Sequence, residues 1–155
     1  RAEADIVLDT TDLNVHELGS KVIAAFQQTE PGLHATVMSF GFKYGLPVDA
    51  DLVVDCRFLP NPHWVPELRS LTGRDEAVRD YVMAQVGADD FLATYEHLLD
   101  VIGAGYQREG KRYVTLAVGC TGGKHRSVAM AEELARRLSS HDIDTAVVHR
   151  DLGRE

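Results

Sequence analysis

Short apolar runs that resemble buried strands alternate with segments of helical periodicity along this chain of 155 residues. The clearest runs cover residues 35–40, 52–56, 113–118 and 144–149, and a further short strand is expected at residues 4–9. Apolar residues with helical spacing are found at residues 13–28, 74–86, 89–102 and 128–139. Near-continuous apolar strands are typical of parallel sheets. The alternation therefore predicts an α/β layered domain with a mostly parallel sheet flanked by helices.

The third of these strands leads into a glycine-rich segment, from Gly119 to Ser127, that has the composition of an anion-binding loop. Its glycines allow a tight turn that presents backbone N–H groups, and the helix after it adds the positive end of its dipole. A strand-to-helix turn whose basic residues face solvent is the alternative. Three successive basic residues oppose the dipole of the helix that they begin, which favours anion binding. The candidate ligand-binding residues here are Cys120, Thr121, Gly122, Gly123, Lys124, His125, Arg126 and Ser127.

Two enzymatic motifs can be compared with this loop. The spacing from Gly119 to Lys124 is one residue short of a Walker A loop, and His125 replaces the Ser or Thr that holds magnesium. The spacing from Cys120 to Arg126 does match the Cys-x5-Arg pattern of cysteine-dependent phosphatases, in which a thiolate attacks phosphorus. Those enzymes usually carry His before the Cys, where this chain has Gly119. Cys120 is therefore either an alternative catalytic nucleophile, with Arg126 as the phosphate clamp, or a small residue packed at the strand end.

A second group of polar candidates lies at the end of the strand at residues 52–56 and in the segment that follows it. Arg57 and His63 are candidates for ligand contact, and Asp55 is suited to orient a base or to accept sugar hydroxyls. The alternative is that Arg57 pairs with a carboxylate and that His63 packs in its loop. Ligands of open parallel sheets bind at the carboxyl ends of the strands, so one crevice could collect both segments. The acidic residues nearby are not spaced to converge, and no metal site is expected.

Composition and charge limit the classes of partner. The net charge of −8 disfavours a surface broadly suited to nucleic acid, although a local cluster can still bind a small anion. No apolar run approaches the roughly 20 residues of a membrane-spanning helix, so no membrane partner is expected. Two cysteines cannot form a disulfide framework, which favours the cytoplasm. The opening residues read as a start inside a longer protein.

Several longer motifs resemble the RapZ/YvcJ family of RNase adapter or nucleotide-binding proteins. The resemblance spans residues 39 to 150. It is carried by the stretches Ser39-Phe-Gly-Phe-Lys-Tyr-Gly-Leu-Pro47, Asp55-Cys-Arg-Phe-Leu-Pro-Asn-Pro-His-Trp64, Leu71-Thr-Gly73, Gly119-Cys-Thr-Gly-Gly-Lys-His-Arg-Ser-Val128 and His149-Arg150.

The resemblance implies a domain organisation and a function. Residues 1–30 would be the end of an N-terminal P-loop domain and a linker, and residues 31–155 the C-terminal ligand-binding domain. The family's N-terminal domain binds ATP or GTP and has weak hydrolytic activity, whereas this domain would need no cofactor and would not be an enzyme. The resemblance further implies binding of glucosamine-6-phosphate or a similar phosphosugar, binding of a small regulatory RNA, and assembly into homo-oligomers.

Two departures from the family pattern bear on these expectations. RNA-binding members end in a cluster of basic residues, whereas this chain ends Arg150-Asp-Leu-Gly-Arg-Glu155. Together with the net charge, this ending argues against tight RNA binding. Cys56 stands where the family usually has an aliphatic residue, which is interpreted as a packing substitution.

Overall fold

The computed structural model describes residues 10, 11, 18, 22, 33–141 and 143–154. The chain divides into two compact units, Arg1–Pro31 and Gly32–Glu155, and the fold described below is that of the second. The strand expected at residues 4–9 lies outside the described residues, as does the helix expected at residues 13–28 apart from positions 18 and 22.

A four-stranded parallel sheet forms the centre of the fold. Its strands are β1 (His34–Gly41), β2 (Leu52–Asp55), β3 (Tyr113–Cys120) and β4 (Asp144–His149). They lie in the order β2-β3-β1-β4, and every neighbouring pair is parallel. The predicted α/β fold with a parallel sheet is confirmed. The third strand is longer than predicted, because the ladder with β1 continues through Gly119 and Cys120.

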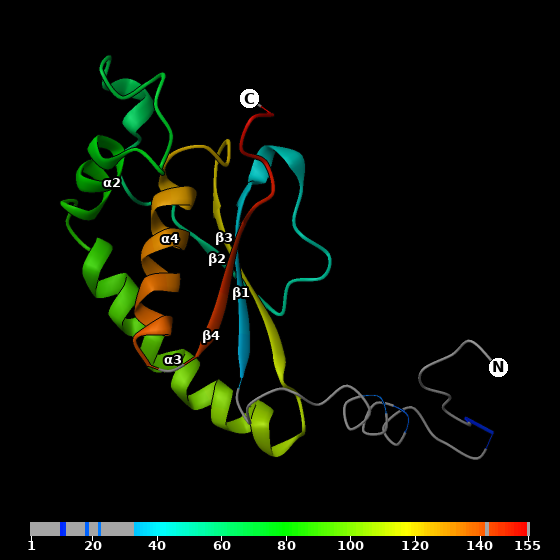
Figure 1. Cartoon of the computed structure of the whole chain (residues 1–155). Coiled ribbons are helices and arrows are strands. Elements are labelled where there is room, and N and C mark those ends of the chain that lie inside the picture. Colours follow the sequence, from blue (N-terminus) through cyan, green and yellow to red (C-terminus); the bar gives the residue numbers. More distant parts are fainter. Residues whose placement is uncertain (1–9, 12–17, 19–21, 23–32, 142, 155) are drawn as a thin grey trace. The chain divides into compact units, whose positions relative to one another are not determined.

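Three α-helices lie on one side of this sheet (Figure 1). They are α2 (Glu76–Met83), α3 (Ala88–Arg108) and α4 (Arg126–Ser139), and two short 3-10 helices, η1 (Phe42–Tyr44) and η2 (Pro62–Trp64), follow β1 and β2. Helix α4 packs on the sheet, and α2 and α3 pack against α4. None of the described helices combines the length and apolar character needed to cross a membrane.

Helix α3 continues six residues past its predicted end at residue 102. Glycine weakens a helix, and Gly103 directly follows the predicted end. Gly103 is instead buried in the helix, and a β-carbon there would lie 3.4 Å from the Leu33 side chain. Packing of the helix against the start of β1 thus outweighs the local preference.

The connections between the strands leave the sheet on opposite faces. Helices α2 and α3 link β2 to its neighbour β3, and α4 carries the chain from β3 across β1 to β4. The other two connections run along the sheet towards β4, whereas the connection from β1 to β2 runs past β3 in the opposite direction. A right-handed crossover in that direction must pass over the other face, and residues 42–51 do so (Figure 1). The neighbouring strands β1 and β3 therefore send their chains to opposite sides of the sheet.

Candidate functional site

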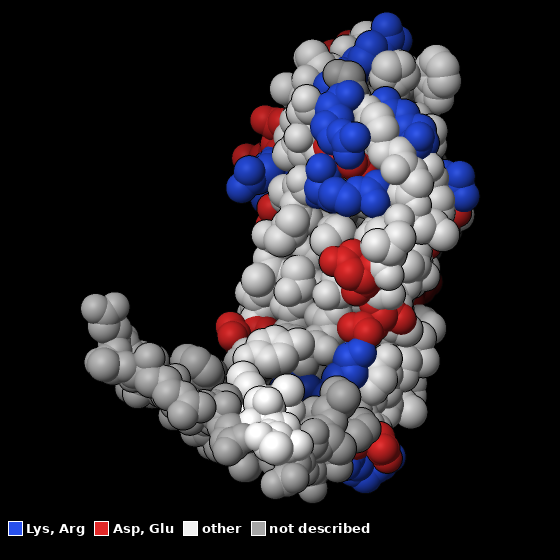
Figure 2. All heavy atoms as spheres, turned by 90° about the vertical axis from the view of Figure 1, so that its right-hand side faces the viewer, with Lys and Arg blue, Asp and Glu red and all other residues white. Residues whose placement is uncertain are grey.

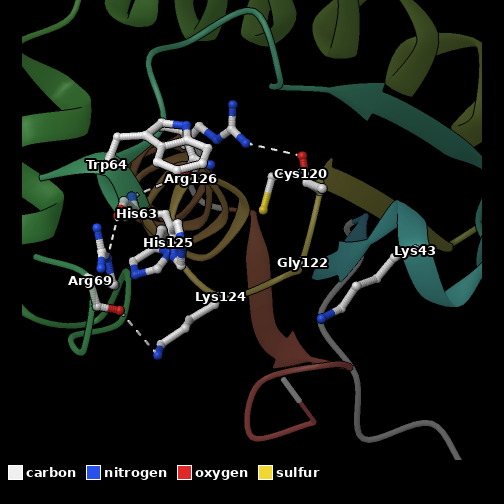
Figure 3. A pocket seen from close by; sticks show the side chains of 11 residues that line it. Lys43, His63, Trp64, Arg69, Cys120, Gly122, Lys124, His125 and Arg126 are labelled. Carbon is white, nitrogen blue, oxygen red and sulfur yellow. Dashed lines mark hydrogen bonds between the residues drawn. The ribbon is translucent and has the colours of Figure 1, made fainter.

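A cavity of about 580 Å³ opens beyond the ends of β1 and β3, where the chains that follow these two strands leave the sheet on opposite faces. Diverging connections leave a crevice beyond the carboxyl ends of the strands, where open α/β sheets bind ligands. Figure 3 shows Lys43 on one side of the cavity and His63, Trp64 and Arg69 on the other. The cavity is lined by Lys43, Asn61, His63, Trp64, Arg69, Cys120, Thr121, Gly122, Lys124, His125 and Arg126.

The lining of the cavity is strongly cationic. Lys43, Arg69, Lys124 and Arg126 come from three different parts of the chain, and no Asp or Glu is among the described residues that line the cavity. Lysine and arginine side chains also gather at one end of the face shown in Figure 2, while acidic side chains lie further along it. Although the net charge of the chain is −8, the electrostatic field at the cavity is therefore locally positive. Among the described residues, no group of three or more His, Cys, Asp or Glu side chains is arranged to hold a metal ion.

The glycine loop, residues 121–125, turns from β3 into α4 under tight backbone constraints. Gly123 has a φ of 79°, and a β-carbon there would lie 2.8 Å from the amide nitrogen of Gly41. A β-carbon on Gly41 would lie 2.6 Å from the carbonyl carbon of Gly122. The loop therefore packs backbone to backbone on the end of β1, and glycine is required on both sides of this contact.

Arg126 joins the glycine loop to the chain after β2. Its Nη1 donates hydrogen bonds to the carbonyl oxygens of Arg57, at 3.1 Å, and Leu59, at 2.9 Å. Its Nη2 donates to Thr121 Oγ1 at 3.3 Å. The side chain is buried at 5% exposure, yet its Nε has no hydrogen-bond partner among the described residues. A buried guanidinium with unused donor capacity beside a cavity is suited to bind an oxyanion.

His125 is the second buried polar side chain of the loop with unused capacity. It precedes α4, is 6% exposed, and its Nε2 finds no hydrogen-bond partner in the part of the chain that the structure describes. Burial, together with the charge of Lys124, lowers the pKa of the His125 imidazole. Its ring centroid lies 6.4 Å from that of His63, on the same side of the cavity (Figure 3). An anion bound beside the His125 ring would favour its protonated form.

Cys120 lies at the end of β3 and contributes the one lining thiol. Its Sγ lies 3.1 Å from Ser127 Oγ and accepts a hydrogen bond from the Gly123 amide at 3.2 Å. The pKa of Cys120 is lowered, chiefly by the neighbouring Cys56 side chain and further by these two contacts. These contacts favour the thiolate form of Cys120. The predicted residues Gly123 and Ser127 support the thiolate and do not line the cavity.

The predicted residues after β2 divide between two environments. His63 lines the cavity, whereas Asp55 and Arg57 are not among the lining residues. The Arg57 guanidinium pairs with the Asp55 carboxylate, with Nη2 2.6 Å from Oδ2, and its centre lies 4.0 Å from the centre of the Phe42 ring. This ion pair lowers the pKa of Asp55. Arg57 contributes to the site through its backbone carbonyl, which accepts from Arg126.

Four lining residues were not predicted as site residues: Lys43, Asn61, Trp64 and Arg69. Lys43 is brought to the loop by its backbone amide, which donates to the Thr121 carbonyl at 3.2 Å. Arg69 donates from its Nε to the carbonyl of His63 at 3.0 Å. The signal for Lys43 was its place in the glycine-punctuated segment that follows a strand. Arg69 lies in no comparable pattern.

Comparison with protein families gives a match over residues 33–153 to the family described as the RapZ C-terminal domain. The chain belongs to this family. Proteins named nucleotide-binding protein from Frankia alni, Acidothermus cellulolyticus and Streptomyces griseus are 70%, 68% and 68% identical over the whole chain, which covers 54%, 52% and 47% of their lengths. The chain thus spans about half the length of the curated relatives that it matches.

The RapZ C-terminal domain match contains all the residues that line the cavity. It also contains the Leu-Thr-Gly stretch at residues 71–73, for which the structure gives a reason. A β-carbon on Gly73 would lie 2.2 Å from the His125 carbonyl oxygen, and the Gly73 amide donates to the Lys124 carbonyl at 2.9 Å. In this domain Gly73 therefore fixes the end of the glycine loop at the start of α4.

Proposed function

We propose that this RapZ C-terminal domain binds a phosphosugar, of the size and charge of glucosamine-6-phosphate, and acts as a non-enzymatic sensor. The observation that carries the proposal is a cavity whose described lining residues include four cationic side chains and no carboxylate. Its volume of about 580 Å³ lies within the range of small-molecule sites, roughly 300–1,000 Å³. Trp64, which is 74% exposed, offers an apolar surface for the sugar ring.

The phosphate group would lie against the glycine loop. Arg126 and His125 would supply the hydrogen-bond donors that are unused in the free domain, and Lys43 and Lys124 would add charge from either side. His63 and Asn61 would contact the sugar from the opposite wall. Asp55 and Arg57 neutralise each other and would hold this wall in place.

Calorimetry with the 155-residue chain tests this proposal. Glucosamine-6-phosphate is expected to bind, whereas glucosamine without its phosphate is expected to give no measurable heat. Lys43→Ala should weaken binding by about tenfold or more, because charge-assisted contacts contribute about 1.5–3 kcal/mol. Lys111→Ala, which removes the ion pair with Asp51 outside the cavity, is the matched control. Equal binding of the sugar with and without phosphate would contradict the proposal.

A cysteine phosphatase is the second candidate function, and the environment of Cys120 favours it. An ionised thiol held by Ser127 and by the Gly123 amide is suited to attack phosphorus. Arg126, however, uses Nη1 on two backbone carbonyls, which limits its capacity to clamp a phosphoryl group. Hydrolysis of p-nitrophenyl phosphate that disappears in Cys120→Ser would establish the phosphatase and exclude the non-enzymatic sensor.

The other partners of the whole protein follow from its relatives and from charge. Since the relatives are named nucleotide-binding proteins and are about twice as long, we propose that the sensor is coupled to an N-terminal ATP- or GTP-binding domain and that it assembles as a homo-oligomer. RNA binding by this domain is expected to be weak at physiological salt, because phosphate contacts dominate RNA affinity. Gel-shift titration at two salt concentrations measures it.

A further inference from the structure

The two cysteines of the chain lie side by side beneath the cavity. The parallel ladder between β2 and β3 pairs Asp55 with Gly119, and the Cys56 amide continues it by donating to the Gly119 carbonyl at 2.9 Å. Cys56 therefore lies beside Cys120. Neighbouring strands are ~4.8 Å apart, which is within the Cα separation that a disulfide needs, about 4.4–6.8 Å. The backbone already has the spacing of a cross-link between strands.

The two thiols differ in contact with the cavity and in the direction of their pKa shifts. Cys120 is 3% exposed and is one of the residues that line the cavity, whereas Cys56 is 0% exposed, is not a lining residue, and donates from its Sγ to the Gly119 carbonyl at 3.0 Å. The contacts of Cys120 lower its pKa, and burial raises the pKa of Cys56. The thiol at the cavity therefore favours the thiolate form, and its neighbour favours the protonated form. Redox-sensing cysteines are accessible thiolates that lie next to a second, resolving cysteine.

We propose that Cys120 and Cys56 form a peroxide-reactive pair, in which a small hydroperoxide entering the cavity oxidises Cys120 and Cys56 then closes a disulfide with it. In the first step the Cys120 thiolate attacks the O–O bond of hydrogen peroxide, forming a sulfenic acid and releasing hydroxide. In the second step the Cys56 sulfur displaces this hydroxyl group, and the Cys56 proton leaves with it as water. Overall, two thiols and one peroxide give one disulfide and two waters.

Occupancy of the cavity should control this reaction, which is the part of the inference that rests on the proposed function. A phosphate held by the glycine loop would block the path to Cys120, because both occupy the same cavity. Formation of the disulfide would in turn draw Cys120 away from Gly123 and Ser127, which its sulfur contacts in the reduced form. Ligand binding and oxidation should therefore oppose each other.

Intact-mass measurement after treatment of the reduced 155-residue chain with hydrogen peroxide tests the pair. Wild type is expected to lose two hydrogens, to remain a monomer by mass, and to resist alkylation by N-ethylmaleimide after denaturation. Cys56→Ala should stop at the sulfenic acid, which dimedone traps. Cys120→Ala should keep Cys56 as a thiol at peroxide doses that convert wild type completely to the disulfide. Circular dichroism is used to check that each variant is folded.

Three results would overturn the proposal: two free thiols in folded wild type after treatment, a cross-link between chains, or oxidation of Cys56 at the wild-type rate in Cys120→Ala. Peptide mapping of wild type alone decides the first two, so the test does not depend on the variants. Repeating the reaction with inorganic phosphate separates the two proposals. If phosphate does not slow disulfide formation, the cysteine pair stands and phosphate binding in this cavity fails.

Discussion

The loops that follow the neighbouring strands β2 and β3 are each associated with an arginine, and the two arginines differ in burial and in whether a carboxylate neutralises them. The glycine loop, residues 121–125, follows β3, and the chain from residue 57 to 66, here named the proline loop, follows β2. Arg126 is buried with an unpartnered Nε, whereas Arg57 has a side chain that is 46% exposed and is neutralised by Asp55. The difference shows that a charge near a crevice is available to a ligand only where the fold gives it no counter-ion.

The largest expected effect is on stability and lies in the glycine loop. Gly123→Ala should lower the free energy of unfolding by about 3 kcal/mol, since it adds left-handed strain of ~1–2 kcal/mol to a contact of 2.8 Å with the Gly41 amide. Gly110→Ala is the control, because Gly110 also has a positive φ of 76° but no atom within 4 Å of the added β-carbon. Urea unfolding measures both, and equal losses would show that the contact with Gly41 adds nothing.

The second prediction contrasts the two arginines directly. Arg126→Ala should weaken sulfate binding by about 10- to 100-fold, the equivalent of ~1.5–3 kcal/mol for a charge-assisted contact. Arg57→Ala should change it by less than about twofold, because Asp55 already neutralises Arg57. Calorimetry on both folded variants decides this. A comparable loss in the two variants would mean that the ion pair opens when the ligand binds.

The third prediction concerns the pH dependence that the glycine loop gains from His125. The folded pKa of His125 lies below its unfolded value of about 6.5, so the folded state disfavours its protonation. Stability should therefore be fully present above that pH and fall as pH decreases from 7 to 5. His125→Asn should flatten this fall by less than about 1 kcal/mol. Denaturant unfolding of wild type and variant at several pH values measures the slope, and identical slopes would assign the effect elsewhere.

The smallest expected effect concerns the ion pair of the proline loop. Asp55→Asn frees Arg57 and removes a negative charge from the edge of the site, so sulfate affinity should rise by about twofold or less. Stability should fall by at most about 1 kcal/mol, as for exposed ion pairs. Asp49→Asn, at an exposed position, is the control. Titration of both variants side by side tests the prediction, and a fall in affinity would mean that Asp55 itself contacts the ligand.

The local sequence pattern was sufficient to locate the strands and helices of the second unit, residues 32–155. Apolar periodicity located β1 to β4 and α4, and glycine with basic residues marked the loop between β3 and α4. It was insufficient at Gly103, one residue past the predicted end of a helix that packing against Leu33 continues. It also grouped Arg57 with the ligand-binding residues, because the sequence alone left open whether a nearby carboxylate would neutralise it.

The sequence by itself determined the α/β class, the glycine loop and the family resemblance that the comparison confirmed, because these depend on short-range pattern and on contiguous motifs. The tertiary structure decided which residues meet. Lys43 and Arg69 reach the cavity, and Cys56 lies behind Cys120, only because the strand order β2-β3-β1-β4 brings these distant segments together. Contacts between residues more than 50 positions apart depend on sheet order and register, and side-chain periodicity along one strand does not specify its neighbours.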